Sequence, residues 1–223
     1  MKATVSELLQ AAFSASEARY PTLANQWIRC SFRIEAVLPN SGISKKVQDM
    51  GLIDRLTRSL EDEWTGSPTS IFSLNNQVLF SSLFIGGIYA VLRALRQRIA
   101  EFNRAGGDPS AISLSLPDLE RLHRDFELIR VPLDKFELPQ ERKISEPIKM
   151  IKVPTTDETS DVYMYDRKDW RRSTIPPFGM SQSTGSVGWL VSALTGQPKW
   201  LYRRSLSDAF LAFADAPNTP NSC

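Results

Sequence analysis

Apolar residues recur at helical spacing along most of residues 1–141. The clearest case is 116–141, where one face is formed by residues that step by 3, 4, 3, 4 and 3: Leu119, Leu122, Phe126, Ile129, Leu133 and Phe136. Pro132 interrupts this face, and Arg130 stands two residues before it. Because proline removes a backbone donor, we predict a core helix, a break and a second core helix, with Arg130 capping carbonyl groups at the break.

Further helices are predicted for residues 5–19, 23–38, 50–64 and 71–104. The pattern of 23–38 also fits a strand, and we favour a helix. The residues expected to face the core are Val5, Leu8, Leu9, Ala12 and Phe13 in the first helix, and Leu52, Ile53, Leu56 and Leu60 in the third. The acidic run 61–63 is expected to face solvent.

Two adjacent glycines, Gly86 and Gly87, lie inside the long predicted helix 71–104. Each costs roughly 1 kcal/mol relative to alanine at such a position. The pair therefore predicts the close approach of another helix, with a kink as the alternative.

Beyond Pro139 the pattern changes to the alternation of apolar and polar residues that is typical of strands. Strands are predicted at 148–153, 161–165, 186–193 and 199–203, and the last two flank a hairpin loop at 194–198. A short helix is predicted for 207–213. The predicted fold is therefore mainly α, with an antiparallel helical bundle (1–141), an α+β extension containing a β-hairpin and packed on the bundle (142–214), and a disordered tail (215–223).

Composition indicates a soluble globular protein, because 42% of the 223 residues are hydrophobic and 23% are charged. The two cysteines, Cys30 and Cys223, cannot form a disulfide framework, so a reducing, cytoplasmic location is expected. Glu7 and Gln10 interrupt the apolar N-terminal residues, and no signal peptide is predicted. The net charge of +2 does not indicate strong general affinity for nucleic acid.

One segment raises the question of a membrane span. Residues 78–92 are almost entirely apolar, and Arg93, Arg96 and Arg98 follow them. This run of 15 residues is shorter than the roughly 18–20 that a span requires. Since the apolar spacing continues through the arginines, a buried bundle helix is the better interpretation, and membrane association through 71–92 is kept as an alternative.

The sequence shows no ligand set for a metal and no glycine-rich nucleotide loop, so no cofactor is expected. His123 is the only histidine. It lies in a charged helical segment and is predicted to be a surface or rim residue.

Two segments of the extension, 166–172 and 199–204, combine arginines with aromatic residues. Such side chains can hold phosphates and stack on unpaired bases. The candidate binding residues are Arg167, Trp170, Arg171, Arg172, Trp200, Arg203 and Arg204. The alternative is that the tryptophans anchor the extension while the arginine stems cover apolar surface.

A helical bundle with an arginine on a late helix resembles HEPN domains, many of which are metal-independent ribonucleases of toxin and phage-defence systems. The resemblance covers about residues 70–141 and implies that Arg130 stabilises phosphate charge. In that family four to six residues separate the arginine from a histidine, but here the corresponding positions hold Lys135, Phe136 and Glu137. Phe136 continues the apolar face, so we expect it in the core and the family's proton transfer to be lost.

The favoured hypothesis is a non-catalytic bundle module that binds a protein or a nucleic acid, with a homodimer also compatible. An alternative is a ribonuclease using Arg130, with Lys135 or Glu137 transferring protons. Metal-independent RNA cleavage that is lost on Arg130→Ala would distinguish the two hypotheses.

Overall fold

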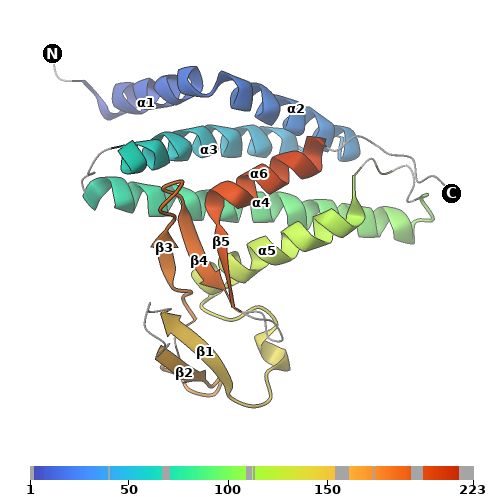
Figure 1. Cartoon of the computed structure of the whole chain (residues 1–223). Helices are drawn as coiled ribbons and strands as arrows, with labels where there is room; N and C mark the ends of the chain where they lie inside the picture. Colours follow the sequence, from blue (N-terminus) through green and yellow to red (C-terminus); the bar gives the residue numbers. More distant parts are fainter. Residues whose placement is uncertain are drawn as a thin grey trace.

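The computed structural model describes residues 3–39, 41–66, 71–108, 112, 114–153, 161–172, 174–191 and 198–215. The protein is mainly α-helical, with two small antiparallel sheets in its C-terminal part (Figure 1). The predicted tail lies outside the described residues except for Asp215, and so does most of the predicted loop 194–198.

Five helices form the antiparallel bundle: α1 (Val5–Arg19), α2 (Pro21–Val37), α3 (Ile43–Gly66), α4 (Ile71–Arg104) and α5 (Leu116–Lys135). Thr4 begins α1 with a capping box that includes Glu7, and Ser115 caps α5. Tyr20, with φ −127° and ψ 58°, is the one non-helical residue between α1 and α2, and Pro21 opens α2, as suits proline in a first helical turn. The predicted helices 5–19 and 71–104 are confirmed.

The paired glycines of α4 have different surroundings. A Cβ added to Gly87 would lie 2.0 Å from Sδ of Met50 on α3, whereas one added to Gly86 would meet nothing within 4 Å. Gly87 therefore permits the close contact between α3 and α4 that the sequence predicted.

The inward face predicted for α1 is wrong at its N-terminal end. Val5, Leu8 and Leu9 are exposed, and Ser16 is the residue of α1 that is buried. Apolar spacing identifies one side of a helix but does not reveal how far a neighbouring helix extends to cover it.

The inward face predicted for α3 is confirmed only in part. Leu56 is buried and Ile53 packs against the main core, whereas Leu52 and Leu60 are only partly buried. The deeply buried side chains of α3 include charged ones, Asp54, Arg58 and Glu61 among them. The solvated face predicted for the acidic run 61–63 is therefore wrong for Glu61, which has no exposed surface, while Asp62 is partly exposed and Glu63 is exposed.

The predicted break in α5 is absent, because the helix runs through Pro132 to Lys135. Phe136 follows in the left-handed conformation, with φ 53°, and its side chain is 63% exposed. Its prediction as a core residue is wrong, since the change of backbone conformation ends the helical periodicity that would have placed it on the buried face.

The extension contains two sheets. β1 (Ile148–Val153) pairs with β2 (Asp161–Tyr165), and β3 (Phe178–Met180), β4 (Val187–Val191) and β5 (Lys199–Tyr202) form a second antiparallel sheet. The predicted strands and the pairing of β4 with β5 are confirmed, whereas β3 was not predicted. Helix α6 (Arg203–Asp215) follows β5 directly and begins four residues before the predicted Ser207.

The two sheets relate differently to the bundle. Buried side chains of β4, β5 and α6 belong to the same core as those of α2, α4 and α5. The β1–β2 hairpin instead packs around a separate cluster of Leu138, Ile144 and Tyr165, next to the short 3-10 helix η2 (Glu141–Lys143). Figure 1 shows this hairpin at the end of the molecule farthest from α1 and α2.

Candidate functional site

The second arginine–aromatic segment, 199–204, is largely directed into the protein. Arg203 is 0% exposed. Its Nε and Nη2 donate to Oε1 of Glu61 at 3.0 and 2.7 Å, its Nη1 pairs with Asp54, and its guanidinium lies 5.6 Å from the centre of the Phe84 ring. Arg203 is therefore not available to a partner, and its prediction as a binding residue is corrected.

This ion pair belongs to a buried network. Arg58 donates from Nε to Oδ2 of Asp54 at 3.1 Å and from Nη2 to Oδ1 of Asp208 at 2.6 Å. The indole of Trp27 donates to Oδ2 of Asp54 at 2.9 Å. Burial acts to raise the pKa of Asp54, but Arg203 and Arg58 outweigh it and the pKa is lowered. The network thus keeps a charged carboxylate inside the core.

The other cations of the segment also have acidic partners. Arg204 Nη1 lies 3.4 Å from Asp62 Oδ1 and 3.7 Å from Glu61 Oε2, and Lys199 Nζ lies 2.6 Å from Asp125 Oδ1. Trp200 is half-buried and is nearly parallel to Tyr202, with ring centres 6.0 Å apart. All three cations of this segment are therefore paired with carboxylates, and the rings of Trp200 and Tyr202 are only partly buried.

The first segment, which we call the basic turn (residues 166–172), is presented to solvent. Trp170 is 85% exposed, and Arg167, Lys168 and Arg171 are also exposed. Two aspartates hold the backbone: Oδ1 of Asp166 accepts from the Lys168 N–H at 2.8 Å, and Oδ1 of Asp169 accepts from the Arg171 N–H at 2.9 Å. Aspartate favours turns in this way, so the indole is held on a fixed backbone.

Arg172 anchors the basic turn to the small β1–β2 core. Its Nε donates to Oε1 of Glu141 at 2.9 Å and to the Tyr165 hydroxyl at 3.1 Å. Tyr165 also donates to Glu141. Burial, followed by the hydrogen bond to Glu141, raises the pKa of Tyr165 to about 12. Arg172 is therefore a positioning residue rather than a free cation.

Several cations around Trp170 are available for a partner. Arg167 donates to the carbonyl oxygen of Arg142 at 3.1 Å, which brings η2 beside the turn. Within the described part of the chain, no ion pair involves Arg142, Lys143, Arg167 or Lys168. Arg171 has one acidic neighbour, Asp169, at 3.3 Å. The surface thus combines one uncovered indole with several exposed positive charges.

A third cluster lies between α4 and α5, and it contains His123. This side chain is only 5% exposed, so its prediction as a surface residue is wrong. Its ring packs against Tyr89 with centres 5.1 Å apart, and Nη1 of Arg96 lies 3.1 Å from its Nδ1. Burial, followed by the charge of Arg96, lowers the pKa of His123 to about 4, so the imidazole is neutral at pH 7.

Arg130 belongs to the same cluster. It pairs with Asp134 one turn further along α5, and its guanidinium lies 5.6 Å from the centre of the Tyr89 ring. The predicted capping of a helix break does not occur, because α5 is continuous there. Tyr89 therefore contacts both His123 and Arg130, which lie two turns apart on α5.

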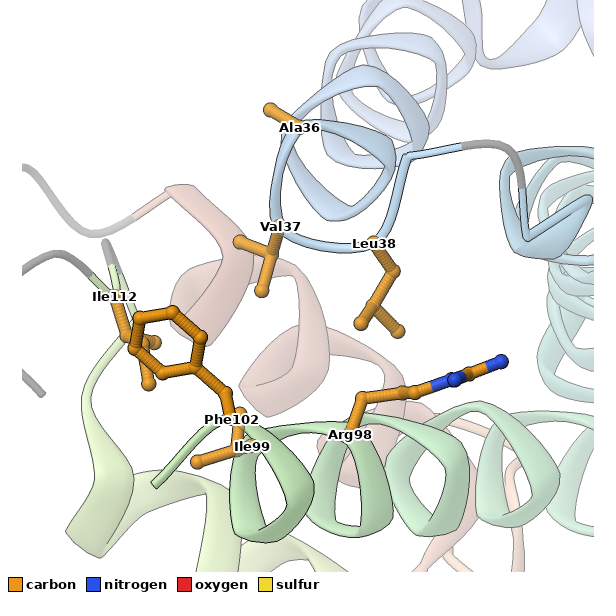
Figure 2. Close-up of a pocket in the computed structure, with 7 residues that line it drawn as sticks. All are labelled: Ala36, Val37, Leu38, Arg98, Ile99, Phe102 and Ile112. Atoms are coloured by element: carbon orange, nitrogen blue, oxygen red, sulfur yellow. The ribbon is translucent and has the colours of Figure 1, made fainter. Parts of the chain in front are cut away.

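A pocket lies elsewhere, where the C-terminal parts of α2 and α4 meet (Figure 2). Its volume is about 200 Å³, and its lining is apolar apart from Arg98: Ala36, Val37, Leu38, Arg98, Ile99, Phe102 and Ile112. Figure 2 shows the Arg98 guanidinium extending away from Phe102, and it pairs with Glu101 at 3.2 Å. None of the predicted site residues lines this pocket.

Two further features bear on metal binding and on the membrane. In the ranges that the structure describes, no three His, Cys, Asp or Glu side chains gather into a ligand set. One described helix, α4, is long and apolar enough to cross a membrane, and 44% of its most apolar window is buried inside the protein. A core helix of a soluble protein has the same properties, so this finding is weak support for a span.

Comparisons of the chain with protein-family models, with curated proteins and with solved structures gave no match. The sequence reasoning missed the buried network and the Tyr89–His123 contact, because their members come from helices far apart along the chain. A signal was present for the network: Asp54, Arg58 and Glu61 are spaced by 4 and 3 residues, which places them on one helix face.

Proposed function

We propose that this protein is a non-catalytic binding module and that the basic turn binds single-stranded nucleic acid. The observation that supports the proposal is the 85% exposure of Trp170 on a hydrogen-bonded turn surrounded by exposed cations. Trp170 is the most exposed of the large hydrophobic side chains that the structure describes, and the exposed cations beside it make this surface suited to a partner with both flat and anionic groups.

The chemistry of the turn favours unpaired bases over a folded duplex. An exposed indole offers a flat face to an unstacked base, and such stacking contributes about 1–3 kcal/mol per base. Arg167, Lys168 and Arg171 are placed to neutralise neighbouring phosphates. Because the turn is already ordered by Asp166 and Asp169, binding needs little further loss of backbone entropy.

The first test is the affinity of the purified protein for fluorescently labelled dT and U oligonucleotides. Trp170→Ala should weaken binding about 5- to 150-fold, the equivalent of losing one stacked base. Phe32→Ala is the matched control, since Phe32 is 65% exposed on α2, and it should leave the affinity unchanged. Equal losses in the two variants would contradict the proposal.

The second test concerns charge. Lys168→Glu should weaken oligonucleotide binding and should make its dependence on salt shallower, with a change of about 1 in the slope of log K against log salt. Lys46→Glu, at an exposed cation of α3, is the control and should leave the slope unchanged. If the wild-type protein binds no oligonucleotide at all, a protein partner replaces nucleic acid as the occupant of the turn.

One observation supports the alternative of a metal-independent, HEPN-like ribonuclease: Arg130 and His123 both contact Tyr89. The Tyr89 ring thus connects the arginine of the resemblance with the one histidine of the sequence, although burial lowers the pKa of His123 to about 4 and makes it a weak proton acceptor. RNA cleavage in EDTA that disappears in Arg130→Ala would favour this alternative over the binding module. No cleavage would leave Arg130 a structural residue of α5.

A further inference from the structure

We infer that the short helix η2 is the second half of the nucleic-acid site, and that Arg142 and Lys143 hold phosphates of the strand whose base stacks on Trp170. This inference rests on the proposed function and deepens it, because it extends the site to a segment 25 residues earlier in the chain. Three observations support it: the direction of the η2 side chains, the contacts that join η2 to the basic turn, and the concentration of positive charge in these two segments.

The geometry of η2 directs its two cations outward. In a 3-10 helix, side chains three residues apart lie on the same side. Glu141 and Ile144 have this spacing and face the small β1–β2 core, since the Glu141 side chain is only 12% exposed and Ile144 is buried. Arg142 and Lys143 lie between them and are exposed. The inward residues thus hold the short helix in place and leave its cations in solvent.

Three contacts hold η2 beside the basic turn. Oε1 of Glu141 accepts from Nε of Arg172 at 2.9 Å and also from the hydroxyl of Tyr165, the residue that precedes the turn. Nη1 of Arg167 donates to the carbonyl oxygen of Arg142 at 3.1 Å. Because the two segments are already joined, a strand that contacts both needs little further ordering of the protein.

Positive charge is concentrated in these two segments. Residues 141–143 and 166–172 contain six arginines and lysines and three carboxylates, a net charge of +3, whereas the whole chain carries +2. Two of the three carboxylates pair with arginines of the same segments. Four of the six cations are in no ion pair within the described part of the chain: Arg142, Lys143, Arg167 and Lys168. An anionic ligand is therefore favoured here, in contrast to segment 199–204, whose cations are all paired.

The number of cations sets the expected salt dependence of binding. Each phosphate neutralised on a single strand contributes about −0.7 to the slope of log K against log salt. The basic turn alone, with Arg167, Lys168 and Arg171, predicts a slope of about −2.1, and the two cations of η2 bring it to about −3.5. The slope therefore reports whether η2 takes part.

The first experiment measures the affinity of the full chain for a labelled dT oligonucleotide at a series of salt concentrations. The double variant Arg142→Gln/Lys143→Gln should reduce the slope from about −3.5 to about −2.1, and its loss of affinity should be about 25-fold larger at ~0.1 M than at ~1 M salt. The matched control is Lys46→Gln/Arg104→Gln, which removes the same charge from exposed positions of α3 and α4 and should keep the wild-type slope.

The outcomes separate this inference from the proposed function. If the η2 double variant keeps the wild-type slope while Lys168→Glu changes it, η2 lies outside the site and the basic turn binds alone. If the control double variant changes the slope as much as the η2 variant, the effect is one of net charge and the inference is overturned. Absence of any oligonucleotide binding by the wild-type protein overturns both.

The second experiment uses the unaltered full chain. Lysines are acetylated with an N-hydroxysuccinimide ester, with and without excess dT oligonucleotide, and the rates are read by mass spectrometry. Lys143 and Lys168 should both react more slowly in the complex, whereas Lys46 should react at the same rate. Protection of Lys168 alone would overturn the inference and keep the basic turn, and unchanged rates at all three lysines in a bound complex would overturn both.

Discussion

The two arginine–aromatic segments of this protein look alike in sequence and have opposite roles in the structure. Residues 166–172 form an exposed turn with Trp170 in solvent, whereas residues 199–204 direct Arg203 into the core. The difference lies in the available carboxylates. Arg203 meets Asp54 and Glu61, which lie 149 and 142 residues earlier in the chain, while Arg171 meets only Asp169 in its own turn.

This comparison shows that a cluster of arginines does not by itself indicate a binding surface. Burial of a guanidinium requires charged partners and hydrogen bonds to offset its lost hydration. Helix α3 supplies them through Asp54 and Glu61, and α6 begins at Arg203 so that the arginine enters the bundle. In the basic turn, only Arg172 meets a carboxylate from another described element, Glu141 of η2, and the side chains of Arg167, Lys168 and Arg171 stay exposed.

The largest expected effect is the loss of the buried cation. Arg203→Met should lower the free energy of unfolding by about 3–5 kcal/mol, because Asp54 and Glu61 are left charged and buried. Arg171→Met, at the exposed segment, should change it by less than about 0.5 kcal/mol. Urea denaturation of both variants measures the difference, and similar values would remove the distinction between the two segments.

The close contact between α3 and α4 positions the α3 residues of the buried network against the bundle. Substitutions at Gly87 test this contact. Gly87→Ala should cost about 1–3 kcal/mol, since the new methyl group overlaps the buried side chain of Met50. Gly86→Ala, in open space one residue earlier, should instead stabilise α4 by up to about 1 kcal/mol. The two denaturation curves should shift in opposite directions, and shifts of the same sign would contradict this packing.

The buried and exposed regions should also differ in their response to acid. The pKa of His123 is about 4 in the folded protein and near 6.5 when the chain unfolds, so the unfolded state takes up a proton first as the pH falls. The stability contributed by the neutral imidazole is fully present above pH 6.5 and is lost between pH 6.5 and 4, by at most about 1.4 kcal/mol per pH unit.

His123→Phe keeps a ring against Tyr89 and should flatten this part of the stability profile. Trp170→Ala, in the exposed turn, should retain the wild-type slope. Denaturation at a series of pH values measures both, and a slope that survives in His123→Phe would assign the effect to another group.

The smallest expected effect concerns the anchor of the basic turn. Tyr165→Phe removes the hydroxyl that bonds Glu141 and Arg172, which should cost about 0.5–1.5 kcal/mol and weaken oligonucleotide binding as the turn loosens. Tyr89→Phe is the control, since among the described residues no hydrogen bond of the Tyr89 hydroxyl is found. Binding that is unaffected by Tyr165→Phe would show that the turn does not need this anchor.

Most of the local elements could be predicted from the order of residues along the chain, although β3 and the continuity of α5 through Pro132 could not. The helices 5–19 and 71–104, the strands 148–153 and 161–165, and the close approach at Gly87 were all predictable, because spacing and backbone preferences act within a few residues. The sequence also identified the basic turn as a candidate surface. It did not determine which helix faces are covered, as the exposed Val5 and Leu8 and the buried Glu61 illustrate.

Which charges are buried and which rings are exposed depends on the packing of distant segments and could not be predicted from local patterns. Arg203, Phe136 and His123 were each assigned to the wrong environment, because burial depends on partners brought together from distant parts of the chain. The partners of Arg203 lie on α3 and a partner of His123 lies on α4. Phe136 has no such partners, because α5 ends before it and its side chain no longer follows the buried face of the helix. A sequence pattern shows which side chains share one face of a helix or strand. Whether burying that face is favourable depends on the side chains that a neighbouring element places against it.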